Sequence, residues 1–355
     1  MPTASDRSSL RNALFSKRYP GLNMKEMTAL QKQNVSFALS TNARGLVAIK
    51  KMESIGMVLK DANVLDVGCA YGGFSIETRR RGAANVYGID VNDELICFAR
   101  ANLSDETEEF KKGCCFVLCD MTSEKALELP NKFFDIIIVN DVFEHIYDTT
   151  RLMSILRILA DTKCVLYFMI PNGLHYLDWV EKEPHYHQYG LSILEPDLWH
   201  KKAHRVYYRR WEYYAALFKQ YGFERIQFLK TPTSASKASI CEDILAKYTN
   251  VAASLKERFN DKTDTQTQEV LTALEKYDAE LQRDIIKMNE DDLHFKYLTD
   301  FWEGVAYVTS SCNDHQTTNT KMHLLKKQYD DLANSKLGRI QIAVWKYRAK
   351  RQLKG

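Results

Sequence analysis

The residues best placed to do chemistry form a glycine-rich segment, Asp66-Val-Gly-Cys-Ala-Tyr-Gly-Gly73. It follows an apolar run with the character of a strand and precedes a run with the character of a helix, which is where open α/β sheets bind their ligands. Glycine lets the backbone approach a ligand closely and adopt a positive φ at low cost. A helix beginning near Phe74 would point its N-terminus at the same place, which favours a bound carboxylate.

Polar residues also stand at the ends of the next three predicted strands. Asp90 ends the second strand, where a carboxylate can accept hydrogen bonds from both hydroxyls of a ribose. Asp120 and Met121 close the third strand, where a carboxylate can accept a hydrogen bond from an adenine amino group while the thioether packs on the ring. Asn140-Asp-Val-Phe-Glu-His145 follows the fourth strand. These strand ends predict a single nucleoside-binding site.

The elements that must position these residues alternate between strands and helices. Apolar, strand-like runs begin at Asn63, Asn85, Cys114, Phe133 and Lys163, and helix-like runs separate most of them. Strands that are apolar on both faces and are separated by helices are typical of a parallel sheet covered on both sides. Right-handed crossovers then predict an α/β fold with a doubly wound sheet.

Taken together, these motifs resemble the class I S-adenosylmethionine-dependent methyltransferases. VLDVGCAYGG is similar to that family's first motif, YGIDVNDELICFARAN to its ribose-binding motif and FFDIIIVNDVFEHI to its fourth-strand motif, and the resemblance covers about residues 60–230. It implies a Rossmann-like sheet, S-adenosyl-L-methionine as cofactor and S-adenosyl-L-homocysteine as product. The cofactor contacts that it implies are Asp66, Gly68, Gly72, Asp90, Asp120 and Asn140. We extend the predicted cofactor site to the neighbouring residues Cys69, Ala70, Tyr71, Val91, Met121 and Asp141.

One residue of the loop departs from this family, which usually has glycine where Ala70 stands. Alanine fits if its φ is negative, so we expect a negative φ and intact cofactor binding. The alternatives for the loop are a nicotinamide site and a purely structural turn. A nicotinamide site needs G-x-G-x-x-G close to the phosphates, and Gly68-Cys-Ala-Tyr-Gly72 has a different spacing.

The acceptor of the methyl group is predicted from the segment after the fifth strand. The Asn-Pro-Pro-aromatic motif of methyltransferases that act on base amines is absent after the fourth strand, so nucleic acid is not an expected partner. Five of the nine histidines, three of the five tryptophans and seven tyrosines lie between Pro171 and Tyr214. Aromatic faces with a few polar groups suit flat or sugar-like acceptors. The segment also resembles, loosely, stand-alone methyltransferases of surface-polysaccharide pathways.

We therefore expect an O-methyltransferase that acts on a sugar hydroxyl, in a cell-surface glycan or its precursor. The alternatives are methylation of a small aromatic, lipid or quinone-like acceptor, and a non-catalytic scaffold that holds partners. A hydroxyl needs a general base, and histidine titrates near neutral pH. The candidates, in order, are His185, His187 and His145. No spacing of acidic residues demands a metal, so no metal site is predicted and Mg²⁺ stays a less favoured second cofactor.

The motifs and patterns divide the chain into five segments. These are an N-terminal helical segment at 1–60, the cofactor-binding core at 61–230 with an acceptor-covering insertion at 171–205, a helical hairpin at 231–300, the last strand of the core sheet at 301–318, and a basic amphipathic tail at 319–355. The hairpin carries apolar stripes that could mediate a homodimer.

The basic charge of the chain is concentrated in its tail. Residues 332–355 carry seven basic and no acidic side chains, which leaves 42 basic and 46 acidic residues in the rest. A basic amphipathic helix can lie on an anionic membrane or dock on a glycan-assembly enzyme. Because the sequence has no transmembrane run and no secretion signal, we expect a cytoplasmic protein, with peripheral contact to the inner membrane surface through this tail.

Overall fold

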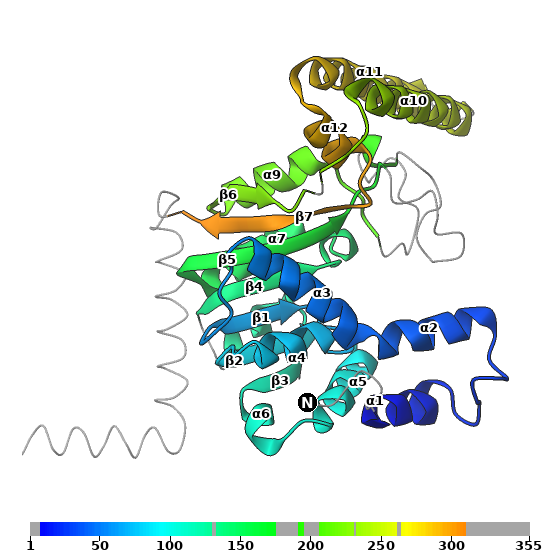
Figure 1. Ribbon diagram of the computed structural model, residues 1–355. Helices are drawn as coiled ribbons and strands as arrows, with labels where there is room; N and C mark the ends of the chain where they lie inside the picture. The colour runs from blue at the N-terminus through cyan, green and yellow to red at the C-terminus, as the bar shows by residue number, and fades with distance from the viewer. Residues whose placement is uncertain are drawn as a thin grey trace, which may run out of the picture.

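A seven-stranded sheet forms the centre of the computed structural model, which describes residues 8–129, 133–174, 191–194, 206–230, 232–260 and 264–309. The strand order is β3-β2-β1-β4-β5-β7-β6, and Figure 1 shows the sheet with helices on both faces. The strands are β1 (Asn63–Val67), β2 (Asn85–Asp90), β3 (Cys114–Leu118), β4 (Phe134–Asn140), β5 (Ala160–Pro171), β6 (Phe223–Phe228) and β7 (Phe301–Val308). The predicted α/β class with a doubly wound sheet is confirmed.

The pairing of the strands brings their carboxyl ends to one edge of the sheet. β1 is parallel to both β2 and β4, so that Asp66 lies between Gly88 and Ile138. The expectation of a purely parallel sheet is wrong at one strand, because β7 runs antiparallel to both of its neighbours, β5 and β6. A long excursion connects β6 to β7, and such a connection can return the chain to the sheet in either direction, whereas the short βα units before it impose parallel pairing.

Helices cover both faces of the sheet. Side chains along each strand point alternately to one face and to the other, and both sets are apolar, so both faces pack against helices. On β1, Leu65 and Val67 point to one face and Val64 to the other, as the two-residue period of a strand requires. One face packs against α3 (Thr41–Ser54), α4 (Gly73–Arg80) and α5 (Asp93–Ser104), and the other against α7 (Thr149–Leu159) and α9 (Trp211–Gln220).

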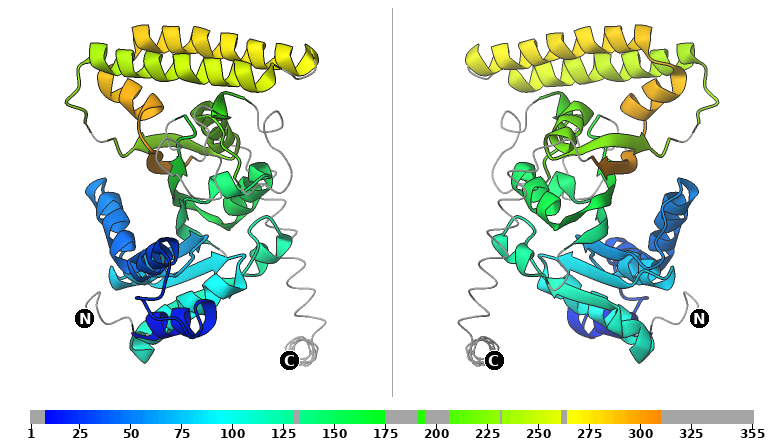
Figure 2. Two further views of the ribbon diagram at one scale, coloured as in Figure 1. Left: turned by 90° about the vertical axis from the view of Figure 1, so that its right-hand side faces the viewer. Right: turned by 90° about the vertical axis from the view of Figure 1, so that its left-hand side faces the viewer.

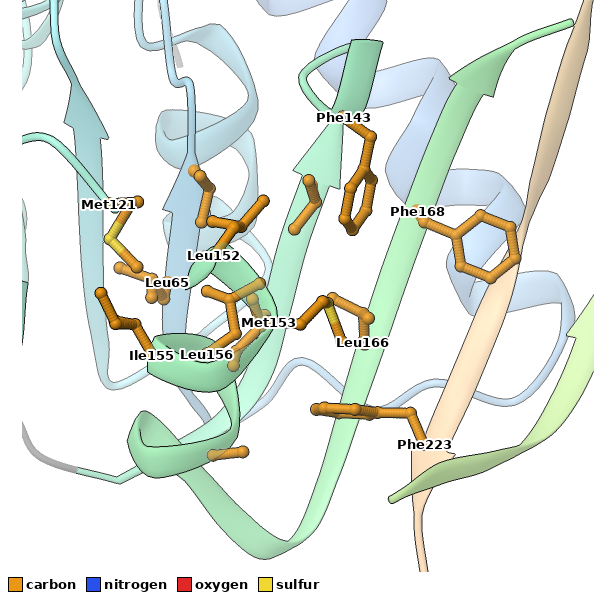
Figure 3. Packing of buried hydrophobic residues seen from close by; sticks show 14 of the residues in the cluster. Leu65, Met121, Phe143, Leu152, Met153, Ile155, Leu156, Leu166, Phe168 and Phe223 are labelled. Carbon is orange, nitrogen blue, oxygen red and sulfur yellow. The ribbon is translucent and has the colours of Figure 1, made fainter. Parts of the chain in front are cut away.

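The face beneath α7 illustrates how this core is filled. Leu152, Met153, Ile155 and Leu156 of α7 point towards Leu65 and the strands beside it (Figure 3). Each of these α7 side chains is almost fully buried, and a buried side chain of this kind stabilises the fold by about 1.5–3 kcal/mol. The helix begins at its N-cap Asp148, whose carboxylate accepts a hydrogen bond from the Arg151 amide.

Shorter elements precede and separate these helices. They are α1 (Ser8–Ala13), the π-helical turn η2 (Leu14–Arg18), α2 (Ala29–Leu39), α6 (Glu108–Lys112) and the 3-10 turns η3 (Glu124–Glu128), η4 (Phe143–His145) and η6 (Leu191–Ile193). Thr28 and Gln31 form a reciprocal capping box at the start of α2, which satisfies two backbone donors. Within the described ranges, no helix has both the length and the apolar character needed to cross a membrane.

A pair of long helices, α10 (Lys237–Phe259) and α11 (Asp264–Lys287), lies side by side at one end of the molecule (Figure 2). Their apolar stripes pack together in one buried cluster, which includes Leu255, Leu274 and Leu281. A short helix, α12 (Glu290–Tyr297), then leads into β7. Dimerisation through this pair stays a prediction, and the basic tail at 319–355 lies outside the described residues.

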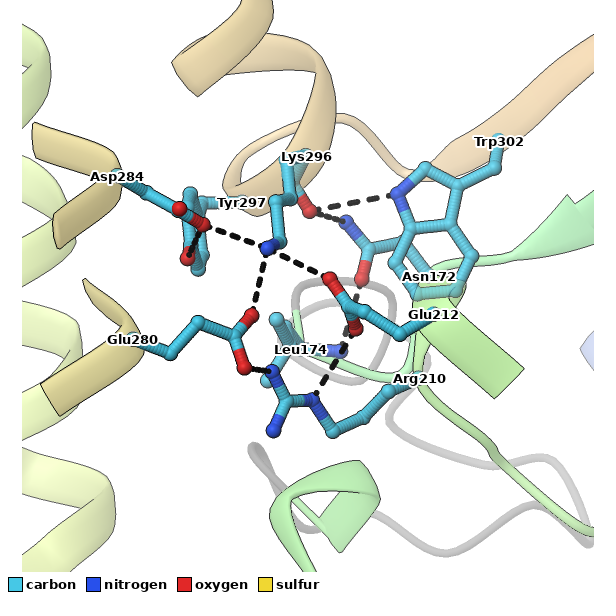
Figure 4. Close-up of polar contacts among 9 residues, drawn as sticks. All are labelled: Asn172, Leu174, Arg210, Glu212, Glu280, Asp284, Lys296, Tyr297 and Trp302. Atoms are coloured by element: carbon cyan, nitrogen blue, oxygen red, sulfur yellow. Dashed lines mark hydrogen bonds and ion pairs between the residues drawn. The ribbon is translucent and has the colours of Figure 1, made fainter. Parts of the chain in front are cut away.

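A buried lysine connects these helices to the sheet. The Lys296 ammonium lies 2.6 Å from carboxylate oxygens of Glu212, Glu280 and Asp284 (Figure 4). Its carbonyl oxygen accepts hydrogen bonds from the Trp302 indole of β7 and from the Asn172 amide that follows β5. One residue therefore joins α9, α11 and α12 to two strands of the sheet.

Replacing Lys296 by methionine should destabilise the protein by about 3–5 kcal/mol, because carboxylates buried beside it would lose their counter-ion. The matched control is Lys276→Met on the exposed face of α11, which should change stability by no more than about 0.5 kcal/mol. Urea denaturation followed by circular dichroism measures both variants. Equal stability of the two would show that the lysine contributes nothing beyond its bulk.

Candidate functional site

The loop after β1 touches the tip of β4 at the point where the strand order reverses. Gly68 has φ +70°, and a Cβ atom on it would lie 2.4 Å from the Val142 side chain. Only glycine satisfies both the positive φ and this close approach. The structure thus joins the two strand ends between which open α/β sheets bind ligands.

Asp90 at the end of β2 holds this loop in place. Its Oδ2 accepts a hydrogen bond of 3.1 Å from the Ala70 amide, and its Oδ1 accepts one of 2.8 Å from the Asn92 amide. The Cys69 amide donates to the carbonyl oxygen of Ile89 at 2.9 Å. Because an ionised carboxylate has about four acceptor positions, Asp90 can still accept hydrogen bonds from a ligand.

Ala70 corrects one expectation from the sequence. Its φ is +46°, in the left-handed region, and not negative as expected. Its amide donates a hydrogen bond to Asp90 in this conformation, and the loop accepts the strain of a Cβ atom there. The geometry of the loop is therefore retained although the glycine is missing.

Asp66 lies beneath the loop and is almost fully buried. The Ser75 hydroxyl in the first turn of α4 donates a 2.5 Å hydrogen bond to its Oδ2. Burial raises the pKa of the Asp66 carboxyl to about 7; the negative charge of Asp90 also raises this pKa, and the hydrogen bond from Ser75 lowers it. Asp66 therefore connects β1 to the N-terminus of α4.

Tyr71 is held by residues that sequence analysis missed. Its hydroxyl accepts a 2.6 Å hydrogen bond from Arg18, and its carbonyl oxygen accepts one of 2.9 Å from the Asn102 amide. Arg18 also forms two hydrogen bonds with Glu94 at the start of α5. The N-terminal segment thus clamps the cofactor loop, a contact that only tertiary structure reveals because Arg18 lies 53 residues away in sequence.

The other predicted cofactor residues lie at the same edge of the sheet. Val91 is 72% exposed after β2, and Asp120 is exposed after β3, with one oxygen engaged by the Thr122 amide and hydroxyl. Met121 is only 4% exposed and packs beneath α7, so little of its surface is left to contact an adenine ring. Asn140 and Asp141 end β4, half-buried and exposed respectively. The structure thus brings the predicted cofactor residues together, and their individual roles stay predictions.

Of the three predicted catalytic histidines, His185 and His187 lie outside the described residues, as does most of the predicted insertion at 171–205. His145 ends η4, with a side chain 42% exposed and Nε2 3.5 Å from Oε1 of Glu144. This places it beside the tip of β4. Among the described residues, no cluster of three or more His, Cys, Asp or Glu side chains is arranged to hold a metal.

The site fits an adenosyl ligand with a carboxylate tail. Gly68 lets the loop lie against the tip of β4, Asp90 keeps further acceptor positions, and α4 begins directly after Gly72. In comparison with known families, residues 27–227 match the methyltransferase domain. The chain belongs to the methyltransferase-domain family. This agrees with the methyltransferase resemblance that the loop and strand-end motifs of the sequence predicted.

Individual relatives are more distant. An uncharacterised protein of Haemophilus influenzae is 33% identical over 96 residues, which are 27% of this chain and 37% of that protein. Among solved structures, a phosphoethanolamine N-methyltransferase of Haemonchus contortus is 17% identical, with 84% of this chain and 60% of that chain covered and a TM-score of 0.43. Magnesium protoporphyrin IX methyltransferase of Synechocystis is 21% identical over 64% of this chain and 94% of that chain, with a TM-score of 0.37. Similarities this low carry no inference about the acceptor.

Replacing Ala70 by glycine should stabilise the methyltransferase by about 1 kcal/mol, because relief of left-handed strain exceeds the extra chain entropy that glycine loses on folding. The control is Ala84→Gly, at an exposed residue whose φ is not positive, which should destabilise the protein. Calorimetry should find the melting temperature of the first variant about 2 °C higher. A lower melting temperature for Ala70→Gly would mean that this conformation carries no strain.

Asp90→Ala should weaken S-adenosylmethionine binding by at least about tenfold, the cost of losing hydrogen bonds to a charged acceptor. Asp93→Ala is the matched control, since Asp93 is an exposed carboxylate three residues further on. Isothermal titration calorimetry measures both dissociation constants. If the two variants bind the cofactor equally well, the strand-end carboxylate is not part of the binding site.

Proposed function

We propose that this methyltransferase acts on a hydroxyl of a sugar, in a cell-surface glycan or its precursor. The observation that supports this acceptor is a group of tyrosines around an arginine, the tyrosine platform: Tyr147, Tyr207, Tyr213 and Arg209. Tyr147 is 60% exposed and Tyr213 37%. The ring centroids of Tyr147 and Tyr207 lie 5.2 Å apart. The Arg209 guanidinium lies 5.7 Å from the Tyr207 ring centre and 4.9 Å from that of Tyr213.

The tyrosine platform is held against the tip of β4. The Tyr207 amide donates a 2.5 Å hydrogen bond to the carbonyl oxygen of Glu144. Arg209 donates hydrogen bonds to the carbonyl oxygens of Ile146 and Tyr147. Val142 in turn lies against Gly68 of the cofactor loop, and this proximity supports the tyrosine platform as the acceptor side of the site. Aromatic faces beside polar groups suit the apolar faces and hydroxyls of a sugar.

The bound cofactor supplies a methyl group on a positively charged sulfur. The chain's own contribution is to hold the acceptor oxygen in line with that methyl group, and such alignment lowers a barrier by up to about 7–11 kcal/mol in favourable systems. The cofactor loop and Asp90 fix one partner, while the tyrosine platform orients the other. The hydroxyl must also give up its proton to a neighbouring base.

A small aromatic or quinone-like acceptor is the second candidate, because the same exposed tyrosine faces can stack on a flat ring. Methylation of a nitrogen atom such as a base amine is disfavoured. The segment Asn140-Asp-Val-Phe at the tip of β4 lacks the prolines of the enzymes that act on base amines.

The test supplies the enzyme with S-adenosylmethionine that carries a trideuterated methyl group. Nucleotide sugars and oligosaccharides form one panel, and catechols and quinols another. We expect the mass label on a sugar hydroxyl, with no labelling by Asp90→Ala. A label found only in the second panel would replace the sugar proposal with its alternative. The absence of label in both panels from an enzyme that binds the cofactor would refute both.

Removing one ring of the tyrosine platform should weaken binding of the acceptor and leave binding of the cofactor unchanged. Tyr147→Ala should raise the KM for the acceptor about tenfold, since one aromatic contact contributes about 1 kcal/mol beyond its buried area. Phe133→Ala is the control, because Phe133 is an exposed aromatic residue at the opposite end of β4. An unchanged KM in Tyr147→Ala would remove the platform from the acceptor site.

A further inference from the structure

The structure carries an acidic side chain at the tip of β4 that sequence analysis did not consider as a base. We infer that Glu144 is the general base that takes the proton from the acceptor hydroxyl, and that Asp141 is the positioning residue that makes it basic. This inference rests on the proposed function, because only a hydroxyl acceptor needs such a base. It replaces histidine as the first candidate for this role.

Glu144 is buried, yet its carboxyl group is incompletely bonded. The residue is 1% exposed, and its Oε2 has no hydrogen-bond partner in the described part of the chain. Buried polar atoms in proteins are nearly always paired, because an unpaired one costs free energy. An oxygen left open at the tip of β4, under the tyrosine platform and beside the cofactor loop, is placed to accept a hydrogen bond from a bound hydroxyl.

The backbone at Asp141 is strained in a way that brings a second carboxyl group to Glu144. Asp141 has φ +60°, a conformation that few residues with side chains adopt. Such outliers cluster at functional sites, where the surrounding structure enforces them. The Asp141 carboxyl group lies close enough to that of Glu144 for its charge to act on it, and Asp141 is itself exposed. It therefore connects the buried carboxyl group to solvent.

The charges around Glu144 favour its protonated form. Burial, and after it the negative charge of Asp141, raise the pKa of Glu144 well above its usual range. Other ionisable groups nearby are the Arg44 guanidinium, which interacts with Asp141, and the buried Tyr214 hydroxyl, which interacts with both Glu144 and Arg209. Nε2 of His145 lies 3.5 Å from Oε1 of Glu144. A general base works best when its pKa is close to the operating pH, and a carboxylate in water is too weak for this purpose.

The proposed step balances as follows. The Glu144 carboxylate accepts the proton of the acceptor hydroxyl while the oxygen forms its bond to the methyl carbon. The carbon–sulfur bond breaks, and its electron pair stays on sulfur, which becomes neutral. Glu144 is left protonated, and its proton leaves to solvent through the exposed Asp141.

The first test observes the carboxyl group directly, without an acceptor. The whole protein is labelled with ¹³C at the glutamate side-chain carboxyl, so that Asp66, which also has a raised pKa, stays invisible. We expect one glutamate to titrate far above the others by NMR, to disappear in Glu144→Gln and to titrate at lower pH in Asp141→Asn. Glu109→Gln, a change at an exposed glutamate of α6, should leave it unchanged. If every glutamate titrates in the ordinary range, the inference is wrong.

The second test separates a proton acceptor from a cation site and from a structural role. Added Mn²⁺ should leave the Glu144 signal sharp; selective broadening would make the two carboxyl groups a metal site and overturn the inference. With a sugar that the wild-type enzyme methylates as the acceptor, Glu144→Gln should lower kcat by about 10²- to 10⁴-fold. Its affinity for the cofactor should be unchanged. Asp141→Asn should move the acid limb of the kcat profile to lower pH.

Failure of this inference differs from failure of the proposed function. If sugars are methylated and Glu144→Gln keeps the wild-type rate, the function holds and Glu144 is not the base. If neither panel is methylated by the wild-type enzyme, the proposed acceptor fails, and with it the need for a base at Glu144.

Discussion

The contact between Gly68 and Val142 is the constraint on which the site depends. It closes the two strand ends of β1 and β4 onto each other, so that the cofactor loop on one side and the acidic tip of β4 on the other share a single location. A side chain at Gly68 would force the tips apart. The cofactor loop and the tip of β4 come from separate segments of the sequence, and the close approach of the Gly68 backbone to the Val142 side chain brings them together.

Around this contact, the protein uses carboxyl groups in three different ways. Asp90 is a hydrogen-bond acceptor for the loop backbone, Asp66 is buried and links a strand to a helix, and Glu144 is buried with an open oxygen. The difference lies in their environments and not in their chemistry. Burial favours the neutral form of a carboxyl group, and it raises the pKa of both Asp66 and Glu144.

The sheet and the cofactor loop could be predicted from the sequence because both rest on local patterns. Alternating apolar runs specify strands and helices, and glycines with strand-end carboxylates mark the loop. Three features could not be predicted, because each depends on contacts distant in sequence or on backbone geometry. Ala70 adopts a positive φ, the clamp on Tyr71 comes from Arg18, and the antiparallel β7 is set by how the chain returns after α12. The contact between Glu144 and Tyr207 is likewise long-range, since the Tyr207 amide, 63 residues downstream, donates a hydrogen bond to the Glu144 carbonyl oxygen.

The position of β7 has a consequence for how the molecule is made. β7 is the neighbour of both β5 and β6, and it pairs Tyr307 with Val165, 142 positions earlier in the chain. Until the ribosome has released residues 301–308, β5 keeps a bare edge and β6 has no partner. Such long-range pairing is slow, and unpaired edges invite association between chains. The sheet can therefore be completed only after the last of its strands in the sequence has been synthesised.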